Sequence, residues 1–270
     1  MGIPSLSLYP LPGVPEVSPG ADLAGLLIEA LANAGLSLEE GDVVCVAQKI
    51  VSKAEWRVVD LSTVTPSPRA LELAPRVDKD PRLVELILAE SRRVVAFRTG
   101  VIVVEHKSGV ILANAGIDHS NVGGGDAAEQ VLLLPEDANA SARRLRDALR
   151  DRTGIAAGVI ITDSVGRPWR LGTTGIALGA AGIPALRDLR GRTDLHGRPL
   201  RVSESADADS LAAAGCLLMG EADEGVPLVL IRGYPYRDEA QTAAALLRDE
   251  GDDLFRHGIA TEHSGQTIKD

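Results

Sequence analysis

The sequence predicts an α+β fold in which antiparallel or mixed sheets carry flanking helices. Three apolar runs between Arg93 and Asn114 are separated only by Thr99-Gly100 and by Lys107-Ser108-Gly109. Connections this short join antiparallel strands, because a parallel crossover needs about a dozen residues or more. Elsewhere, helical and strand-like segments do not alternate regularly. This irregular order disfavours a doubly wound parallel sheet.

The segments before Arg93 predict three helices and one strand. Apolar residues at helical spacing predict a helix over residues 23–34, which Gly35 ends. The apolar run 43–47 predicts a buried strand that leads into the sequence 48–53. Prolines at 66, 68 and 75 bracket a short helix near residues 69–73. Pro81 suits the first turn of another helix that runs to about Glu90.

The segments after Asn114 predict further strands and helices. Apolar runs predict strands over residues 131–134, 159–162 and 228–231. Helices are predicted over residues 141–152, where Leu145 and Leu149 share one face, and over residues 205–219. The Gly- and Pro-rich stretch 170–200 predicts loops and short strands. A last helix is expected over residues 238–248, before a polar, mobile tail after His257.

Composition narrows the possible functions. Aromatic residues make up 3% of the chain, so a base-stacking platform for nucleic acid is not expected. The net charge of -10 also disfavours a polyanionic partner, although a bound cation would allow one small anionic ligand. Cys45 and Cys216 lie in apolar contexts and are expected as reduced thiols. With no export signal or membrane-length apolar segment, we expect a soluble, cytoplasmic protein without a nucleic-acid or membrane partner.

Two acidic residues follow apolar, strand-like runs. Asp118 comes shortly after residues 110–114, and Asp163 comes directly after residues 158–162. A carboxylate at the end of a buried strand has a rigid support and faces a crevice. Mg²⁺ and Mn²⁺ prefer such oxygen ligands, and the hydroxyl of Ser164 could bind a neighbouring ion. The alternative is that both acids cap turns, a common use of Asp.

Two further segments could bind phosphate or metal. Lys53 could reach a phosphate as a point charge, or it could be a solvated lysine at a strand end. The chain contains no G-x-x-x-x-G-K-[ST] phosphate loop. The glycines at 220 and 225 flank three acids, which could wrap a nucleotide or hold a second metal ion through Glu221. The alternative is an acidic surface turn.

A third segment follows Asp163 and carries two arginines, Arg167 and Arg170. Their planar guanidinium groups could neutralise a phosphate or a carboxylate of a substrate. Alternatively, Trp169 between them is a packing anchor and both arginines are solvated. The sequence leaves this choice open.

Taken in order, these segments resemble the coenzyme F420-0:γ-glutamyl ligase family. The matching stretches are Leu11-Pro12-Gly13, residues 48–55, residues 114–118 with Ser120-Asn121, residues 162–164, residues 166–170, Gly220 with residues 223–227, and residues 231–233. The similarity runs from about Tyr9 to Tyr236. The motifs around Asp118 and Asp163, in this order and context, make the resemblance specific.

The resemblance implies an activity and an assembly. The family adds L-glutamate to the lactyl carboxylate of the deazaflavin precursor F420-0, and then a γ-linked glutamate to F420-1, with GTP as co-substrate. The implied cofactors are two Mg²⁺ or Mn²⁺ ions, with K⁺ as a further candidate. The implied structure is an intertwined homodimer with an α+β fold peculiar to the family. Residues 1–236 would form the ligase domain, in two intertwined subdomains, and residues 237–270 the last helix and mobile tail.

The resemblance also implies the site residues. Asp118 and Asp163 would be catalytic and would bind one metal ion, and Ser164 and Glu221 would bind a second. The implied GTP-binding residues are Leu11, Pro12, Gly13, Val14, Gln48, Lys49, Lys53, Asn121, Gly220, Glu221, Ala222, Asp223, Glu224, Gly225, Val226 and Pro227. Glu221 departs from the family's pattern, since some members have Gln at this position.

Two other functions stay open. The chain could be a related ligase that joins another amino acid or acts on another acid, or a non-catalytic deazaflavin-binding or carrier protein. A protein that only binds its ligand has no need for paired metal carboxylates. The set of Asp118, Asp163 and Ser164 therefore disfavours the carrier.

Overall fold

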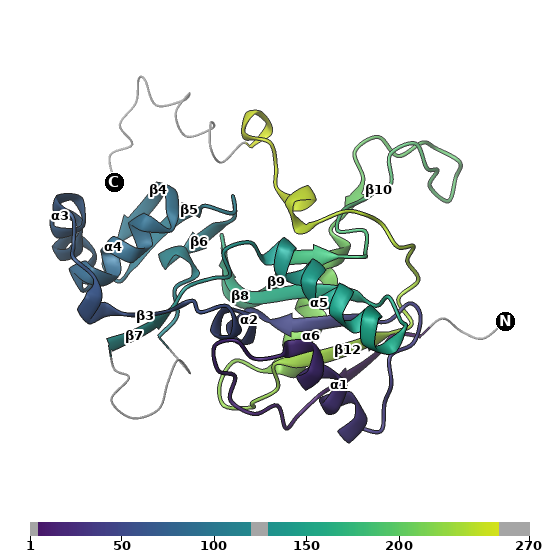
Figure 1. The fold of residues 1–270 in the computed structure, drawn as a ribbon. Coiled ribbons are helices and arrows are strands. Elements are labelled where there is room, and N and C mark those ends of the chain that lie inside the picture. The colour runs from purple at the N-terminus through teal and green to yellow at the C-terminus, as the bar shows by residue number, and fades with distance from the viewer. Residues whose placement is uncertain (1–4, 120–128, 254–270) are drawn as a thin grey trace.

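A computed structural model describes residues 5–119 and 129–253, which form a large and a small lobe (Figure 1). The large lobe is built on a five-stranded sheet of order β1-β12-β2-β8-β9. Its strands are β1 (Ser7–Pro10), β12 (Leu228–Arg232), β2 (Val43–Ala47), β8 (Gly158–Arg167) and β9 (Arg170–Ala181). β2 and β8 are parallel, whereas the other neighbours are antiparallel. The prediction of an α+β fold with mixed and antiparallel sheets is confirmed.

Helices cover both faces of this sheet. Val44 and Val46 of β2 belong to the apolar core that includes α1 (Leu23–Asn33), α2 (Gln48–Ala54) and α5 (Ala138–Thr153). Val43 and Cys45 belong to the core on the opposite face, against α6 (Asp207–Met219). Because both faces are buried, the sequence of β2 reads as a continuous apolar run instead of alternating.

The small lobe contains the antiparallel sheet expected between Arg93 and Asn114. It consists of β4 (Ser91–Arg98), β5 (Val101–His106) and β6 (Ile111–Ala113), in that order. The helices α3 (Pro68–Val77) and α4 (Pro81–Ala89) pack on it around a core that includes Val84, Ile87 and Ile102. A two-stranded sheet of β3 (Val58–Asp60) and β7 (Gln130–Leu132) joins this lobe to the large one (Figure 1).

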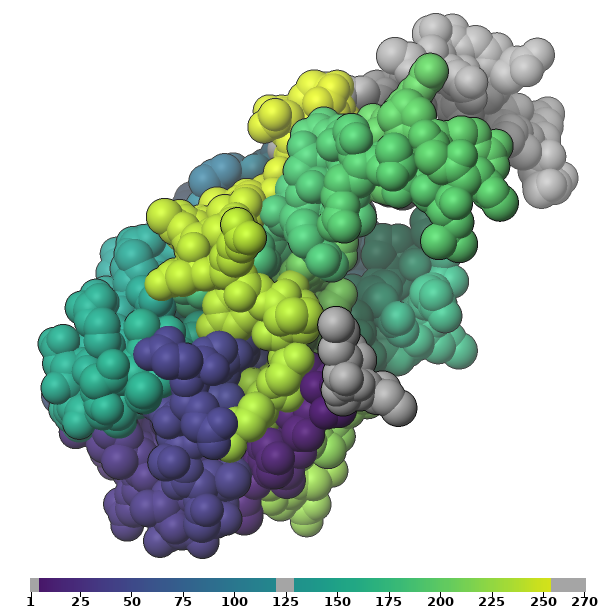
Figure 2. All heavy atoms as spheres, turned by 90° about the vertical axis from the view of Figure 1, so that its right-hand side faces the viewer, coloured from purple at the N-terminus to yellow at the C-terminus, as the bar shows by residue number. Residues whose placement is uncertain are grey.

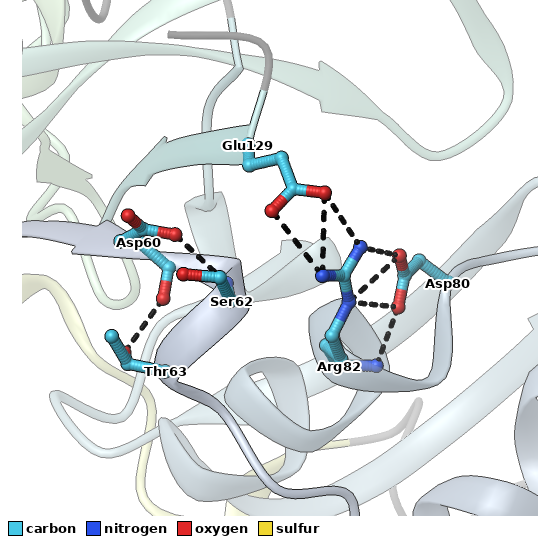
Figure 3. Close-up of polar contacts among 6 residues, drawn as sticks. All are labelled: Asp60, Ser62, Thr63, Asp80, Arg82 and Glu129. Atoms are coloured by element: carbon cyan, nitrogen blue, oxygen red, sulfur yellow. Dashed lines mark hydrogen bonds and ion pairs between the residues drawn. The ribbon is translucent and has the colours of Figure 1, made fainter.

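Polar contacts fix the start of α4 to the residue before β7 (Figure 3). The carboxylate of Asp80 accepts a hydrogen bond of 2.7 Å from the backbone amide of Arg82, which caps the helix. The Arg82 guanidinium lies 2.7 Å from Asp80 and 3.4 Å from Glu129. Hydrogen bonds from Arg82 hold the pKa of Asp80 below its usual value. Nearby, Asp60 caps a 3-10 turn, Leu61–Thr63, through the amide of Ser62.

Two helices differ from the sequence prediction. Residues 48–53 were not expected to be helical, yet they form α2, because Ile50 and Val51 are buried against the sheet when the segment is helical. The helix α3 continues past Pro75 to Val77. Pro75 cannot donate to the carbonyl of Leu71, but that residue is exposed and its carbonyl can be hydrated.

Residues 170–200 were predicted to form loops and short strands, and this prediction was wrong for the first part of the stretch. β9 runs for 12 residues, and two of its glycines, Gly175 and Gly179, lie where helices approach the sheet. A Cβ atom on Gly175 would lie 2.6 Å from the carbonyl oxygen of Ala212 in α6, and one on Gly179 would lie 2.2 Å from that of Ala138 in α5. These glycines therefore mark close helix–strand packing rather than turns.

The remaining part of that stretch forms an arm with two short strands, β10 (Arg187–Asp188) and β11 (Glu204–Ser205). Figure 2 shows this segment, in green, standing out from the body of the molecule. Its apolar residues Leu195 and Val202 are 101% and 86% exposed. The arm thus presents apolar side chains that the described part of this chain does not cover.

The last predicted helix, over residues 238–248, was wrong. This segment contains the 3-10 turn Ala243–Leu246 and is followed by a second, Glu250–Asp252. Its polar groups bond to the body of the protein: Gln241 accepts from the amide of Leu186, and the amide of Ala243 donates to Asn139. These bonds fix the backbone in a non-helical path. The tail predicted to be mobile after His257 lies outside the described residues.

The two cysteines are free thiols, as expected. Cys45 is fully buried in the core next to α6, and burial raises the pKa of the Cys45 thiol well above its usual value. In the part of the chain that the structure describes, no helix has both the length and the apolar character needed to cross a bilayer.

Candidate active site

A cavity of about 570 Å³ lies where the two lobes meet. Its size is typical of a small-molecule or nucleotide site. Five segments line it: the loop 14–17, the end of β2 with α2, the chain at Asp118, the middle of β8, and the end of α6 with the loop that follows. The lining residues are Val14, Pro15, Glu16, Val17, Ala47, Gln48, Lys49, Ile50, Lys53, Asp118, Thr162, Asp163, Ser164, Cys216, Met219, Gly220, Glu221, Ala222, Asp223, Gly225, Val226 and Pro227.

Asp163 lies inside a strand and not beyond the end of one. β8 continues to Arg167, so Asp163 and Ser164 belong to its hydrogen-bonded ladder with β9. The register shifts between Ile161 and Thr162, where β9 carries one extra residue. Such a bulge changes the direction of neighbouring side chains. The sequence suggested a strand end because the apolar run stops at Ile161, but pairing with β9 extends the strand.

Asp118 comes from the small lobe. It follows a 3-10 turn, Asn114–Gly116, in which Asn114 and Ala115 have left-handed backbone angles of φ 52° and 57°. The side chain of Asn114 accepts a hydrogen bond from the amide of Ile102, which supports this strained turn. The backbone of Asp118 then exchanges two hydrogen bonds with Leu132, of 3.0 and 2.8 Å. The carboxylate is thereby directed to the cavity, where it meets α2.

Two lysines on one face of α2 carry positive charge in the cavity. The Nζ atom of Lys49 lies 2.5 Å from Oδ2 of Asp118. Lys53, one turn further on, lies 3.5 Å from Glu16 and its side chain is only 12% exposed. Acidic lining residues outnumber these lysines; they are Glu16, Asp118, Asp163, Glu221 and Asp223. The cavity is therefore acidic before any ligand binds.

Burial raises the pKa of Asp163 to about 7. The neighbouring carboxylates of Asp118 and Glu221 raise it further, and the amide of Ser164 and the charge of Lys49 oppose them. Like charges held together in a shielded cavity are costly unless a cation or a proton neutralises them. A strongly shifted pKa in a cleft also marks a candidate functional group.

The loop after α6 is held by its own acids. Ser164 donates a hydrogen bond of 2.7 Å to Oε1 of Glu221, which ties the loop to β8. Glu224 turns back and accepts a hydrogen bond of 2.8 Å from the amide of Ala222. Its carboxylate packs on Gly220, where an added Cβ atom would lie 2.1 Å from it. Glu224 thus shapes the loop and, unlike the neighbours expected with it, does not line the cavity.

Gln48 offers a hydrogen-bond donor to the cavity. Its side chain is almost fully buried, and Oε1 accepts a hydrogen bond of 2.9 Å from the hydroxyl of Ser52. The other end, Nε2, has no partner among the described residues. A buried amide donor without a partner costs free energy unless a ligand or water bonds to it.

The structure brings most of the predicted site residues together. Of the residues expected around GTP, Val14, Gln48, Lys49, Lys53 and seven residues of the 220–227 loop line the cavity. Leu11 is fully buried in the core and does not line it, and neither do Pro12 and Gly13. Asn121 lies outside the described residues.

The predictions missed eight cavity residues, among them Glu16, Thr162 and Cys216; the others are Pro15, Val17, Ala47, Ile50 and Met219. Thr162 Oγ1 lies 3.3 Å from Cys216 Sγ at the cavity wall. None of Glu16, Thr162 and Cys216 has a recognisable motif of its own, although Thr162 adjoins Asp163 in the sequence. The packing-anchor interpretation of Trp169 was wrong, because this residue is 91% exposed at the β8–β9 turn. Arg167 and Arg170 flank it and do not line the cavity.

The donor set fits a divalent cation that binds together with phosphates. Within residues 5–119 and 129–253, no three His, Cys, Asp or Glu side chains form a complete metal cluster. Mg²⁺ needs no such cluster, because it is commonly held by one or two carboxylates together with water and substrate phosphates. Asp118, Asp163 and the hydroxyl of Ser164 supply ligands of this kind to one cavity.

Comparison with known proteins identifies the family. Residues 13–233 match the family described as F420-0:Gamma-glutamyl ligase. A coenzyme F420:L-glutamate ligase from Methanopyrus kandleri is 45% identical, over 94% of this chain and 99% of the relative. Proteins of the same description from Methanothermobacter thermautotrophicus and Haloarcula marismortui are 45% and 43% identical, over 93% and 94% of this chain and 99% and 97% of the relatives.

Fold and cavity define an α+β protein with a shielded, acidic site of nucleotide size. The chain belongs to the F420-0:gamma-glutamyl ligase family. The resemblance inferred from the motifs around Asp118 and Asp163 is thereby confirmed.

Proposed function

We propose that this chain is a GTP-dependent ligase of coenzyme F420 biosynthesis. It adds L-glutamate to F420-0 and then a γ-linked glutamate to F420-1. Membership of the family and the description of the relatives as coenzyme F420:L-glutamate ligases support the amide-forming reaction. The observation that carries the proposal is the pairing of Asp118 and Asp163 in one cavity with Lys49 and Lys53.

The charges of the cavity support a nucleotide that binds with divalent cations. Five acids against two lysines would repel the phosphates of GTP. In this proposal, Asp118 and Asp163 hold one Mg²⁺ or Mn²⁺ ion, Ser164 and Glu221 hold a second, and K⁺ is a further candidate. When bound, such cations neutralise the charge that develops on the phosphates during transfer.

The nucleotide would be bound by residues of the large lobe and by Asn121. Gln48 would donate its unpartnered amide, and Lys49 and Lys53 would contact phosphates. The loop 220–227, the segment 11–14 and Asn121 complete the proposed binding set. Pro12, Gly13 and Leu11 would act by shaping the loop that carries Val14, since only Val14 of this segment lines the cavity.

The reaction proceeds in two steps. A carboxylate oxygen of the substrate attacks the γ-phosphorus of GTP, the bond to the β-phosphate oxygen breaks, and GDP leaves with that electron pair. The product is an acyl phosphate. The amine of glutamate then attacks the acyl carbon, inorganic phosphate leaves, and the amine proton passes to solvent or to a base. The contribution of the chain is to position the reactants and to exclude water, which would hydrolyse the acyl phosphate.

The test combines purified protein, F420-0, L-glutamate, GTP and Mn²⁺, and reads the product by mass. We expect one or more glutamate additions with release of GDP and phosphate. No addition with GTP intact would contradict the ligase and would favour a deazaflavin-binding carrier. Addition only with another amino acid or acid would indicate a related ligase. Asp163→Asn should abolish turnover and leave the fold intact.

We also propose that the protein acts as an intertwined homodimer. Trp169 and Leu171 at the β8–β9 turn are 91% and 97% exposed, and Leu195 on the arm is 101% exposed. Exposed apolar residues on the β8–β9 turn and on the arm favour burial against a second copy. Light scattering coupled to size-exclusion chromatography should give twice the chain mass of 28.3 kDa. A single-chain mass at micromolar concentration would contradict the dimer.

A further inference from the structure

The ion pair between Lys49 and Asp118 joins the two lobes across the cavity. Lys49 lies on α2 of the large lobe, and Asp118 is bonded to Leu132 of the small lobe. Their charged atoms are 2.5 Å apart, and the side chains are only 30% and 26% exposed. Partial shielding from water strengthens such a pair beyond that of an exposed surface pair.

We propose that Lys49 is an exchangeable counter-ion for Asp118. In the cation-free protein its ammonium group neutralises this carboxylate. When a divalent cation binds, Lys49 gives up Asp118 and turns to a phosphate of the nucleotide. This inference rests on the proposed function in taking Asp118 as a cation ligand and Lys49 as a contact of the nucleotide phosphates.

The chemistry of both groups supports an exchange. An ammonium group within 2.5 Å of a carboxylate oxygen occupies the space that a cation would take, and the two positive charges would repel each other. Lysine has a flexible four-carbon stem with a compact charge, so it can move without a change in the backbone. It also lies beside Gln48, whose unpartnered Nε2 offers a second donor for the same ligand.

Lys53 provides the contrast within the same helix face. It lines the same cavity, but its partner is Glu16, at 3.5 Å. Glu16 is 72% exposed, so this pair is weak and lies on the outer side of the site. Loss of Lys53 removes the same charge without freeing a proposed cation ligand.

The exchange couples the two ligands. A divalent cation that binds alone must displace Lys49 from Asp118. A nucleotide that binds alone must draw Lys49 away from its ion pair with Asp118. Each ligand removes part of the cost of binding the other, and this coupling is reciprocal by thermodynamic necessity. We expect the nucleotide to tighten Mn²⁺ binding by about tenfold, within the range common for coupled sites.

The experiment measures Mn²⁺ affinity by the electron paramagnetic resonance signal of free Mn²⁺. Wild type, Lys49→Met and Lys53→Met are titrated with and without a non-hydrolysable GTP analogue. Without the analogue, Lys49→Met should bind Mn²⁺ about tenfold more tightly than wild type. Lys53→Met should change this affinity by less than about threefold, as expected for a weak pair. The analogue should then tighten Mn²⁺ binding to wild type but by less than about threefold to Lys49→Met.

Three results would overturn the proposal. They are unchanged or weaker Mn²⁺ binding by Lys49→Met, an equal gain in Lys53→Met, and the absence of Mn²⁺ binding to wild type. Lys49→Arg keeps a cation on Asp118 and should retain the metal-only affinity of wild type, which covers the case in which Lys49→Met does not fold. Failure of glutamate addition in the ligase assay, with these shifts intact, would overturn only the proposed function.

Discussion

The hydroxyl of Ser164 donates a hydrogen bond of 2.7 Å to Oε1 of Glu221, 57 residues further along the chain. This bond ties the middle of β8 to the loop after α6 and so closes one side of the cavity. It also gives Glu221 a role that does not depend on its charge, because the amide oxygen of Gln can accept the same bond.

We therefore predict different effects for three substitutions at this contact. Glu221→Ala and Ser164→Ala should each lower Mn²⁺ affinity and turnover by about tenfold or more, as is common when a group that orients a ligand is lost. Glu221→Gln should lose clearly less, since it keeps the hydrogen bond. The measurements are Mn²⁺ titration and the rate of glutamate addition. Equal losses in Glu221→Gln and Glu221→Ala would show that the charge of Glu221 is what counts.

Removal of the Asp163 charge should stabilise the metal-free protein above neutral pH. The pKa of Asp163 is raised to about 7 from 3.8, so the folded state holds the proton more tightly than the unfolded chain does. This contribution favours folding at low pH and is lost as pH rises from about 4 through 7. Asn at this position is uncharged at every pH, so the stability of Asp163→Asn does not fall in this way as pH rises.

The melting temperature of Asp163→Asn relative to wild type, measured in EDTA, should therefore increase between pH 5 and pH 8. Asp223→Asn removes an equal charge from an exposed position of the same cavity and should show a smaller trend. A difference in melting temperature that is constant across this pH range would contradict the prediction.

Glu90 should stabilise the small lobe against acid. The ring of His106, whose Nε2 lies 3.8 Å from Glu90, and the charges of Arg57 and Lys107 lower the pKa of Glu90 to about 2. The Arg57 guanidinium lies 2.5 Å from Glu90 and also donates to the carbonyl of Leu134. Because this pKa is lowered from 4.5, the stabilisation is complete above that pH and is lost as pH falls toward 2.

Glu90→Gln should cost about 3 kcal/mol in the free energy of unfolding at pH 7, because it leaves the Arg57 charge largely buried without its partner. Denaturant titrations at pH 7, 5 and 3 check this value. The gap between variant and wild type should shrink at pH 3, where protonation of Glu90 begins. An equal gap at all three values would mean that the Glu90 charge contributes nothing.

Gly175 and Gly179 of β9 should be intolerant of any side chain. Gly179→Ala would place a Cβ atom 2.2 Å from the carbonyl oxygen of Ala138, and we expect a loss of about 3 kcal/mol or more in stability. Gly166→Ala, on the adjacent strand β8, is the matched control. No atom lies within 4 Å of the methyl group that this substitution adds. Urea unfolding of both variants separates packing from the general effect of replacing glycine. Equal stability of the two variants would contradict the close approach of α5.

Local patterns predicted the elements whose partners lie nearby in the chain. The strand at residues 43–47 and the three strands between Arg93 and Asn114 follow from apolar runs and short turns, and both were confirmed. β9 could not be predicted, because Gly175 and Gly179 read as turn residues until α5 and α6 are placed against them. The segment 238–248 was predicted as a helix because local sequence does not reveal the tertiary hydrogen bonds, to Leu186 and Asn139, that fix its backbone.

The candidate site was predictable in its motifs but not in its geometry. The sequence patterns suggested Asp118, Asp163 and Ser164 as candidate metal ligands, the family resemblance added Lys49, and all four line one cavity. That Asp163 lies inside a strand depends on pairing with β9, which no local signal reveals. The presence of Glu16 in the cavity depends on the path of a loop with no regular structure.

Asp118 and Asp163 lie on opposite sides of the boundary between the small and the large lobe. Asp118 is hydrogen-bonded to Leu132 of the small lobe, whereas Asp163 is part of a ten-residue strand of the large sheet. The chain passes from the large lobe to the small lobe between α2 and β3 and returns between β7 and α5. A rotation of one lobe relative to the other would change the distance between the two carboxylates. An ion held by both carboxylates would therefore oppose such a rotation.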